Sequence, residues 1–119
     1  MTEQAAMAKI VYDALDEKKG DDIRIIDISQ ITMIADYFVI ASGGSSNQIQ
    51  ALINNVEEQM QKSGYTVKRI EGNKNSTWVL MDYGDVIVHV FDKEDRLFYD
   101  LERIWSDGRQ IDAEALQED

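Results

Sequence analysis

The sequence contains no cysteine and no proline, and His89 is its only histidine. Without cysteine, disulfide bonds and thiolate metal sites are excluded, and a single histidine excludes a cluster of histidine ligands. No apolar run approaches the roughly 20 residues that cross a bilayer, and residues 1–10 lack the basic start and apolar core of a signal peptide. We therefore expect a cytoplasmic protein without a membrane partner.

Basic residues are also few, because 12 Lys and Arg stand against 23 Asp and Glu, for a formal net charge of −11. This charge opposes binding to a polyphosphate chain, so we expect contact with nucleic acid to be peripheral at most. The charge is not confined to the acidic end of the chain, since residues 1–109 are acidic without residues 110–119. An acidic body favours a basic protein surface as its partner.

The length and the apolar periodicity predict one α/β domain over residues 1–109, followed by an acidic, disordered tail over residues 110–119. A helix begins at the N-cap residue Thr2 and ends at Gly20, and a second begins after Ser46 and ends at Gly64. The remaining elements are five short strands and a third helix, at residues 23–28, 37–42, 65–70, 78–83, 86–91 and 97–105. We expect a mixed five-stranded sheet with about three helices, in which the unit 37–70 makes its two strands parallel.

The strongest local signal is the pair of apolar runs 78–83 and 86–91 on either side of Gly84-Asp85. A two-residue turn with glycine first is typical of a II′ hairpin and aligns Trp78 with Phe91. Side chains alternate between the two faces of a strand, so this register separates two surfaces. One carries Val79, Met81, Tyr83, Val86, Val88 and Val90, and we expect helices to cover it. The other carries Trp78, Leu80, Asp82, Ile87, His89 and Phe91, and we expect part of it to stay open.

The second surface combines an indole, a carboxylate and the only imidazole, but it does not predict catalysis. Asp82 and Asp85 lie near His89 in the predicted hairpin without a recognisable nucleophile, so we interpret His89 as a ring satisfied by one hydrogen bond or as a contact residue. Trp78 is equally compatible with a core position and with an exposed anchor, whereas the helical spacing of Trp105 favours the core. We expect no cofactor, no metal and no enzymatic activity.

A glycine- and serine-rich turn, Gly43 to Ser46, joins a strand to a helix, where backbone N–H groups could hold a phosphate. It lacks the P-loop lysine and the GxGxxG spacing, so a plain turn with a serine N-cap is favoured. A nucleotidyltransferase would also need two alternating aspartates on a strand shortly afterwards. The corresponding residues 54–58 fall inside the predicted helix.

Several segments, in one order, resemble the bacterial ribosomal silencing factor family, also called Iojap-like, over residues 5–106. They are Asp36-Tyr37-Phe38-Val39-Ile40-Ala41-Ser42-Gly43 with Ser45 and Gln48, Glu71-Gly72, Trp78, Asp82-Tyr83-Gly84-Asp85, His89-Val90-Phe91, Arg96, Tyr99, Leu101-Glu102 and Trp105. The chain departs from the family by lacking a proline after Gly64. The resemblance implies a reduced nucleotidyltransferase-like fold, binding to the large ribosomal subunit through its protein fourteen, and obstruction of small-subunit joining.

The family match and the hairpin geometry together predict the protein-binding residues, which are Glu71, Trp78, Leu80, Met81, Asp82 and Tyr83. Trp78 is the expected anchor, and Glu71 and Asp82 are expected to meet Lys or Arg of the partner. The hairpin register places Met81 and Tyr83 on the core face, so these two rest on their closeness to the hairpin end. Two alternatives stay open at this stage. One is a nucleotide-binding or nucleotidyltransferase-like remnant enzyme that uses Ser45, Ser46 and Asp82, and the other is a homodimer that pairs through the open face.

Overall fold

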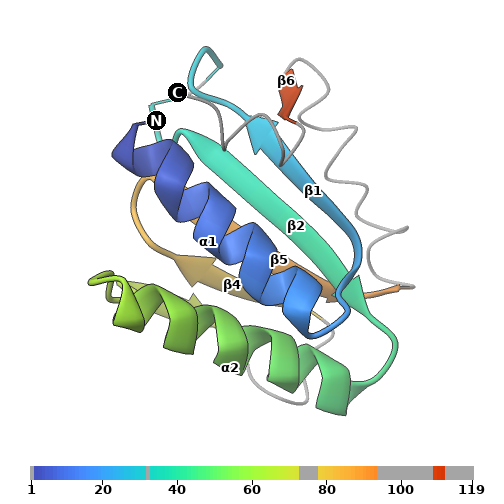
Figure 1. The fold of residues 1–119 in the computed structure, drawn as a ribbon. Helices are drawn as coiled ribbons and strands as arrows, with labels where there is room; N and C mark the ends of the chain where they lie inside the picture. The colour runs from blue at the N-terminus through green and yellow to red at the C-terminus, as the bar shows by residue number, and fades with distance from the viewer. Residues whose placement is uncertain (1, 32, 73–77, 94–108, 112–119) are drawn as a thin grey trace.

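The protein folds into two layers, a mixed sheet with both described helices on one of its faces (Figure 1). The structure is a computed structural model, and it describes residues 2–31, 33–72, 78–93 and 109–111. Helix α1 spans Glu3–Glu17 and helix α2 spans Ser46–Lys62. Both helices begin where the sequence predicts. The hydroxyl of Thr2 accepts the backbone N–H of Ala5, and that of Ser45 accepts the N–H of Gln48.

The sheet has six strands in the order β3-β4-β5-β2-β1-β6. Their bounds are Asp21–Asp27 (β1), Tyr37–Gly43 (β2), Arg69–Glu71 (β3), Trp78–Asp82 (β4), Val86–Asp92 (β5) and Arg109–Ile111 (β6). Strands β2 and β5 are parallel, and every other neighbouring pair is antiparallel. The five predicted strands and the mixed sheet are therefore confirmed. Strand β3 runs in the same direction as β2, as the unit 37–70 predicted, with β4 and β5 between them.

The predicted strand over residues 65–70 is shorter than expected, because only Arg69–Glu71 joins the sheet. The N–H of Tyr65 instead donates to the carbonyl of Met60 and completes the end of α2. Tyr65 and Val67 pack against the core as partly buried side chains. Their alternation, which predicted a strand, thus reflects packing against the helical layer rather than pairing with a neighbouring strand.

The C-terminal part of the prediction also differs from the structure. Strand β6 pairs with β1, Gln110 opposite Ile26, so the predicted boundary between residues 109 and 110 falls inside a strand and the sheet has six strands instead of five. Backbone pairing at a sheet edge needs no apolar periodicity, so the local sequence does not reveal it. The predicted third helix, 97–105, and the rest of the tail lie outside the described residues.

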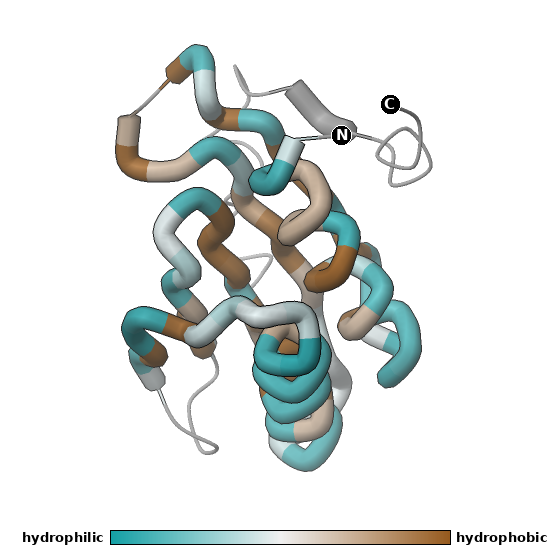
Figure 2. Tube along the Cα trace, turned by 60° about the vertical axis from the view of Figure 1, so that its left-hand side comes forward, coloured by the Kyte–Doolittle hydropathy of each residue, from teal (hydrophilic) through white to brown (hydrophobic). Residues whose placement is uncertain are grey.

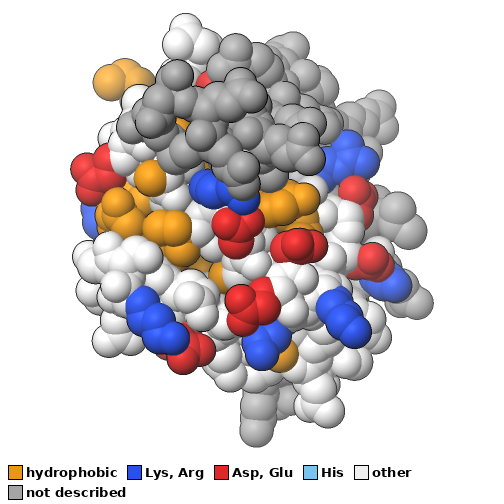
Figure 3. Space-filling view, in the orientation of Figure 1, with side chains coloured by type: hydrophobic (Ala, Val, Ile, Leu, Met, Phe, Trp, Pro, Cys, Tyr) orange, Lys and Arg blue, Asp and Glu red, His pale blue; other side chains and the backbone are white. Residues whose placement is uncertain are grey.

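The core lies on both sides of the sheet. The larger cluster joins the helices to one face, with Val11 of α1, Leu52 of α2, and Val39 and Val88 of the sheet fully buried. Figure 2 accordingly shows the hydrophobic stretches in the middle of the molecule and mainly hydrophilic residues at the outer turns of the helices. Charged side chains of both signs surround small hydrophobic patches on the helix-covered side (Figure 3). None of the described helices is long and apolar enough to cross a membrane.

Candidate functional site

The β4–β5 hairpin has the predicted register. Trp78 pairs with Phe91, Leu80 with His89 and Asp82 with Ile87. Gly84 has φ +88°, a left-handed conformation that glycine adopts without steric cost. Across the turn the N–H of Tyr83 donates to the carbonyl of Val86 at 3.0 Å. A tight turn with glycine first therefore set the alignment of the two strands, as the local sequence predicted.

The register separates the two predicted surfaces. All six side chains of the helix-covered surface are buried in the larger core cluster: Val79, Met81, Tyr83, Val86, Val88 and Val90. We call the opposite surface the Trp78 face, formed by Trp78, Leu80 and Asp82 of β4 with Ile87, His89 and Phe91 of β5. Part of it is closed by a second, smaller core cluster in which Phe91 and Ile87 are buried together with Phe38. The open part of the Trp78 face is its β4 side.

Trp78 differs from its neighbours in exposure. Its side chain is 37% exposed, whereas that of His89 is 5% exposed and that of Phe91 is 2% exposed. Leu80 and Asp82 are half-buried. The sequence was equally compatible with a core position and an exposed position of Trp78, and the structure shows a ring that is partly buried and partly accessible. Such a ring is suited to binding, because aromatic anchors contribute large contact area at little conformational cost.

The rings of the Trp78 face form an ordered stack. The Trp78 ring is nearly parallel to that of His89, with centroids 6.1 Å apart, and to that of Phe91, with centroids 5.9 Å apart. Phe38 of the neighbouring strand β2 meets the His89 ring edge-on at 4.8 Å. The indole N–H of Trp78 donates to Nδ1 of His89 at 3.3 Å. His89 thus makes one side-chain hydrogen bond, to the neighbouring tryptophan, but the described residues leave its second ring nitrogen unsatisfied, so the prediction is met only in part.

Burial sets the protonation of His89. Removal from water disfavours the imidazolium and lowers the pKa of His89 from its ordinary 6.5 to about 4. The ring is therefore neutral at physiological pH. Its Nε2 atom is buried, and none of the described residues provides it with a hydrogen-bond partner. A neutral, enclosed imidazole of this kind is poorly placed for acid–base catalysis, which needs an exchangeable proton near a reacting group.

The acidic residues of the candidate surface have partners within the protein. Glu71 of β3 pairs with Leu80 and so lies on the same side of the sheet as the Trp78 face; its carboxylate is 3.2 Å from Nε of Arg69. Asp82 is the cross-strand partner of Arg69, and its Oδ1 accepts the N–H of Gly84 at 2.7 Å. Arg69 was not among the predicted site residues, although its alternation with Glu71 along one strand could have indicated it. The charge beside Trp78 is mixed.

Met81 and Tyr83 are not accessible as side-chain contacts. Met81 is fully buried and Tyr83 is 5% exposed, both beneath the helical layer. Burial, and next the negative charge of Glu57, raises the pKa of Tyr83 well above its ordinary value, and its buried hydroxyl has no hydrogen-bond partner among the residues that the structure describes. Their closeness to the hairpin end does not bring them to the surface, because side-chain alternation directs them inward. The structure thus places Glu71, Trp78, Leu80 and Asp82 together and separates Met81 and Tyr83 from them.

The residues of the nucleotide-binding alternative do not meet. At the turn after β2 the N–H of Gly44 donates to the side chain of Gln48 at 2.7 Å, and Ser45 caps α2. Gly43 pairs with Asp92 at one end of β5, whereas Asp82 pairs with Ile87 near the other. At about 3.3 Å per residue the two ends are roughly 16 Å apart. Among the described residues no group of three or more acidic, histidine or cysteine side chains could hold a metal.

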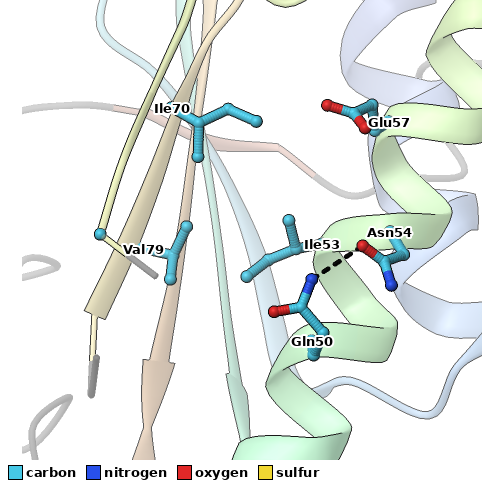
Figure 4. A pocket seen from close by; sticks show the side chains of 7 residues that line it. Gln50, Ile53, Asn54, Glu57, Ile70 and Val79 are labelled. Carbon is cyan, nitrogen blue, oxygen red and sulfur yellow. Dashed lines mark hydrogen bonds between the residues drawn. The ribbon is translucent and has the colours of Figure 1, made fainter. Parts of the chain in front are cut away.

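A small pocket lies on the helix-covered side, between α2 and the β3–β4 edge (Figure 4). It has a volume of about 220 Å³, and its lining residues are Gln50, Ile53, Asn54, Glu57, Ile70, Gly72 and Val79. The side-chain N–H of Gln50 donates a hydrogen bond to Oδ1 of Asn54 at 2.8 Å. Because Val79 and Trp78 point to opposite faces of β4, the pocket is separate from the Trp78 face.

Comparison with known proteins connects this arrangement to a family. The family model described as "Ribosomal silencing factor during starvation", RsfS, matches residues 1–119. The chain is 40% identical over 111 residues to the ribosomal silencing factor RsfS of Bacillus subtilis strain 168, an alignment that covers 93% of this chain and 94% of the relative. It is 31% identical over 99 residues to the chloroplastic protein Iojap of Zea mays, covering 83% of this chain and 43% of that protein.

A solved structure agrees with the fold. The crystal structure of a Chromobacterium violaceum protein superimposes with a TM-score of 0.85 at 34% sequence identity, covering 93% of this chain and 92% of that one. The likeness therefore extends over nearly all of both proteins. It includes the sheet that carries the Trp78 face.

Proposed function

The chain belongs to the RsfS family of ribosomal silencing factors, and on this basis we propose that it binds the large ribosomal subunit and blocks joining of the small subunit. The contact is made with ribosomal protein fourteen through the Trp78 face. Translation is repressed because the bound domain occupies space at the intersubunit surface. The protein acts in the cytoplasm, and no catalytic step is involved.

The observation that carries this proposal is the partial exposure of Trp78 on an ordered surface. The indole is 37% exposed while the rings of His89 and Phe91 beside it are buried, so the anchor is accessible and its orientation is restricted by packing. Leu80 beside it is half-buried and packs against the smaller core cluster. Together they present an apolar patch with a rigid base, the arrangement in which a few residues contribute most of the binding free energy.

Charge supports a basic protein as the partner. The formal net charge of −11 gives long-range attraction to a basic surface and repels RNA phosphates. Glu71 is the acidic side chain best placed for contact, since it lies on exposed β3 next to the Trp78 face. Its present partner Arg69 is also exposed, so a lysine or arginine of the ribosomal protein can compete for the carboxylate. Contacts with ribosomal RNA are peripheral.

A second copy of the chain is a further occupant of the same face. Trp78 is an exposed large hydrophobic residue, and half-buried Leu80 lies beside it on the Trp78 face; an apolar patch of this kind is stabilised by burial against itself across a two-fold axis. A homodimer formed in this way would cover the anchor. Subunit binding and dimerisation would then be mutually exclusive.

The decisive experiment is co-sedimentation of the purified protein with isolated large and small ribosomal subunits. We expect binding to the large subunit alone and, when both subunits are mixed, fewer joined ribosomes as the protein concentration rises. Cross-linking followed by identification of the joined protein tests the contact with ribosomal protein fourteen. Binding to the small subunit, or an unchanged amount of joined ribosomes at saturation, would contradict the proposal.

A further inference from the structure

We infer that His89 is a positioning residue for Trp78, holding the exposed indole in its docking orientation by accepting the indole N–H. The inference rests on the proposed function, because it concerns the anchor of the proposed contact. His89 cannot take part in the contact directly, since its side chain is 5% exposed. It acts through Trp78, which lies between the imidazole and the partner.

The hydrogen bond assigns the tautomer of His89. Nδ1 accepts the indole N–H at 3.3 Å, so Nδ1 carries no proton and the neutral ring has its proton on Nε2. A separation of 3.3 Å is at the long end for an N–H donor, which makes this bond a modest source of free energy. Its importance is directional. The N–H group points toward His89 of β5, so the orientation of the partly exposed indole is set from within the protein.

The surrounding rings restrict how His89 can respond. Phe38 lies edge-on to the imidazole at 4.8 Å, and Phe91 is nearly parallel to it with centroids 6.2 Å apart. His89 itself is enclosed, and Ile40, its backbone partner on β2, is fully buried. An imidazole held on several sides has few alternative rotamers in a close-packed interior. The acceptor atom is therefore fixed in place before Trp78 is engaged.

The unmet Nε2 atom supports a specific role for the polar ring. In the described part of the chain nothing accepts the buried Nε2–H of His89, and such a group costs free energy that an apolar ring of similar shape would avoid. The neighbouring rings Phe38 and Phe91 are apolar and buried, so the surroundings of the imidazole favour an apolar ring. What a histidine adds at this position is the Nδ1 acceptor, and Trp78 is the side chain that uses it.

Preorganisation explains how this bond strengthens docking. A partly exposed tryptophan loses rotamer freedom when a partner covers it, and that loss opposes binding. The His89 acceptor and the stacked Phe91 ring remove part of this freedom in the free protein. Without the acceptor, the indole N–H would turn toward water. The partner would then bind only one of several rotamers of the Trp78 side chain, and this would weaken docking.

The test compares affinities for the large subunit among variants of two residues. His89→Phe removes the acceptor, whereas His89→Asn places an amide oxygen near the position of Nδ1. We expect His89→Phe to weaken docking about threefold to tenfold, the effect of losing one neutral hydrogen bond, and His89→Asn to stay within about twofold of the wild type. In a Trp78→Phe background, which has no indole N–H, His89→Phe should cause no further loss.

The free protein provides a readout that does not depend on the ribosome. The indole ¹H–¹⁵N cross-peak of Trp78 should move upfield in His89→Phe and remain near its wild-type position in His89→Asn. If His89→Phe does not fold, His89→Gln replaces it, because its polar group lies at the place of Nε2 instead of Nδ1. An unmoved cross-peak, or a docking defect that persists in the Trp78→Phe background, would overturn the inference. If the wild type does not bind the large subunit, the proposed function is refuted. The cross-peak of Trp78 would still show whether His89 holds the indole.

Discussion

The carboxylate of Asp82 closes the β4–β5 turn, because its Oδ1 accepts the backbone N–H of Gly84 at 2.7 Å. Asp82 therefore has a structural role in addition to its position on the Trp78 face. Asp82→Ala should lower the free energy of unfolding by about 1 kcal/mol, and Asp82→Asn, which keeps an acceptor oxygen, by less. Chemical denaturation of the three proteins measures the difference. Equal stabilities of Asp82→Ala and the wild type would show that the hydrogen bond between Asp82 and Gly84 does not stabilise the folded protein.

Trp78 is expected to dominate docking. Trp78→Ala should weaken binding to the large subunit by about 2 kcal/mol or more while the protein stays folded by circular dichroism. Met33→Ala is the matched control, because Met33 is a fully exposed apolar side chain in the loop between β1 and β2 and is not one of the residues that form the Trp78 face. Normal affinity of folded Trp78→Ala, or an equal loss in both variants, would remove Trp78 as the anchor.

Charge at β3 should influence the rate of association more than its final strength. Glu71→Lys reverses a charge beside the Trp78 face, so we expect slower association with the large subunit at low ionic strength and a smaller effect at high salt. Glu71→Gln also removes the ion pair with Arg69, but it changes the charge by half as much as Glu71→Lys. We therefore expect it to change the logarithm of the association rate constant by about half as much. Stopped-flow measurements at two salt concentrations test this. A defect that does not depend on salt would indicate packing instead of steering.

His89 should make stability depend on pH. Its pKa is about 4 in the folded protein and 6.5 as its ordinary value, so between these values the unfolded chain binds a proton that the folded chain does not. Stability contributed by the neutral ring is complete above about pH 6.5 and is lost as the pH falls toward 4, by on the order of 3 kcal/mol in total. His89→Asn removes this titration and leaves the carboxyl groups unchanged. The free energies of unfolding of wild type and His89→Asn should therefore converge or cross as the pH falls; a constant difference would contradict the predicted shift.

Two glycines have left-handed conformations, and comparing their alanine variants distinguishes the cost of backbone strain from the cost of a steric clash. Gly72 has φ +96°, and a Cβ there would be 2.6 Å from the carbonyl oxygen of Trp78. Gly64 has φ +93°, and a Cβ there would meet no atom within 4 Å. Gly64→Ala should cost about 1 kcal/mol of stability from the backbone alone, and Gly72→Ala should cost more because the strand bearing Trp78 must shift.

Thermal unfolding ranks the two glycine variants, and large-subunit binding adds a second measure. Only Gly72→Ala is expected to weaken docking, since only that substitution displaces Trp78. Equal melting temperatures and equal affinities of the two variants would mean that a Cβ at position 72 does not displace Trp78.

Much of the fold could be predicted from the sequence where the interactions are local. The hairpin register follows from a two-residue turn and two apolar runs, and both helix starts follow from a capping hydroxyl. The lengths of β3 and β6 could not be predicted, because each depends on whether a distant strand offers a free edge. The candidate site was predicted in part. Leu80 and Asp82 lie beside Trp78 as expected, whereas Met81 and Tyr83 belong to the core.

By itself, the sequence determined the order of the elements from α1 to β5, the hairpin alignment and the division of β4 and β5 into two surfaces, since these depend on residues close in the chain. The side of the hairpin that the helices cover was also predicted, whereas tertiary structure alone decided how deeply each ring is buried. His89 is enclosed by rings that include Phe38 from β2, whereas Trp78 at the start of β4 stays 37% exposed. Burial is a sum over contacts from distant segments, so no local pattern could separate the buried imidazole from the exposed indole that it holds.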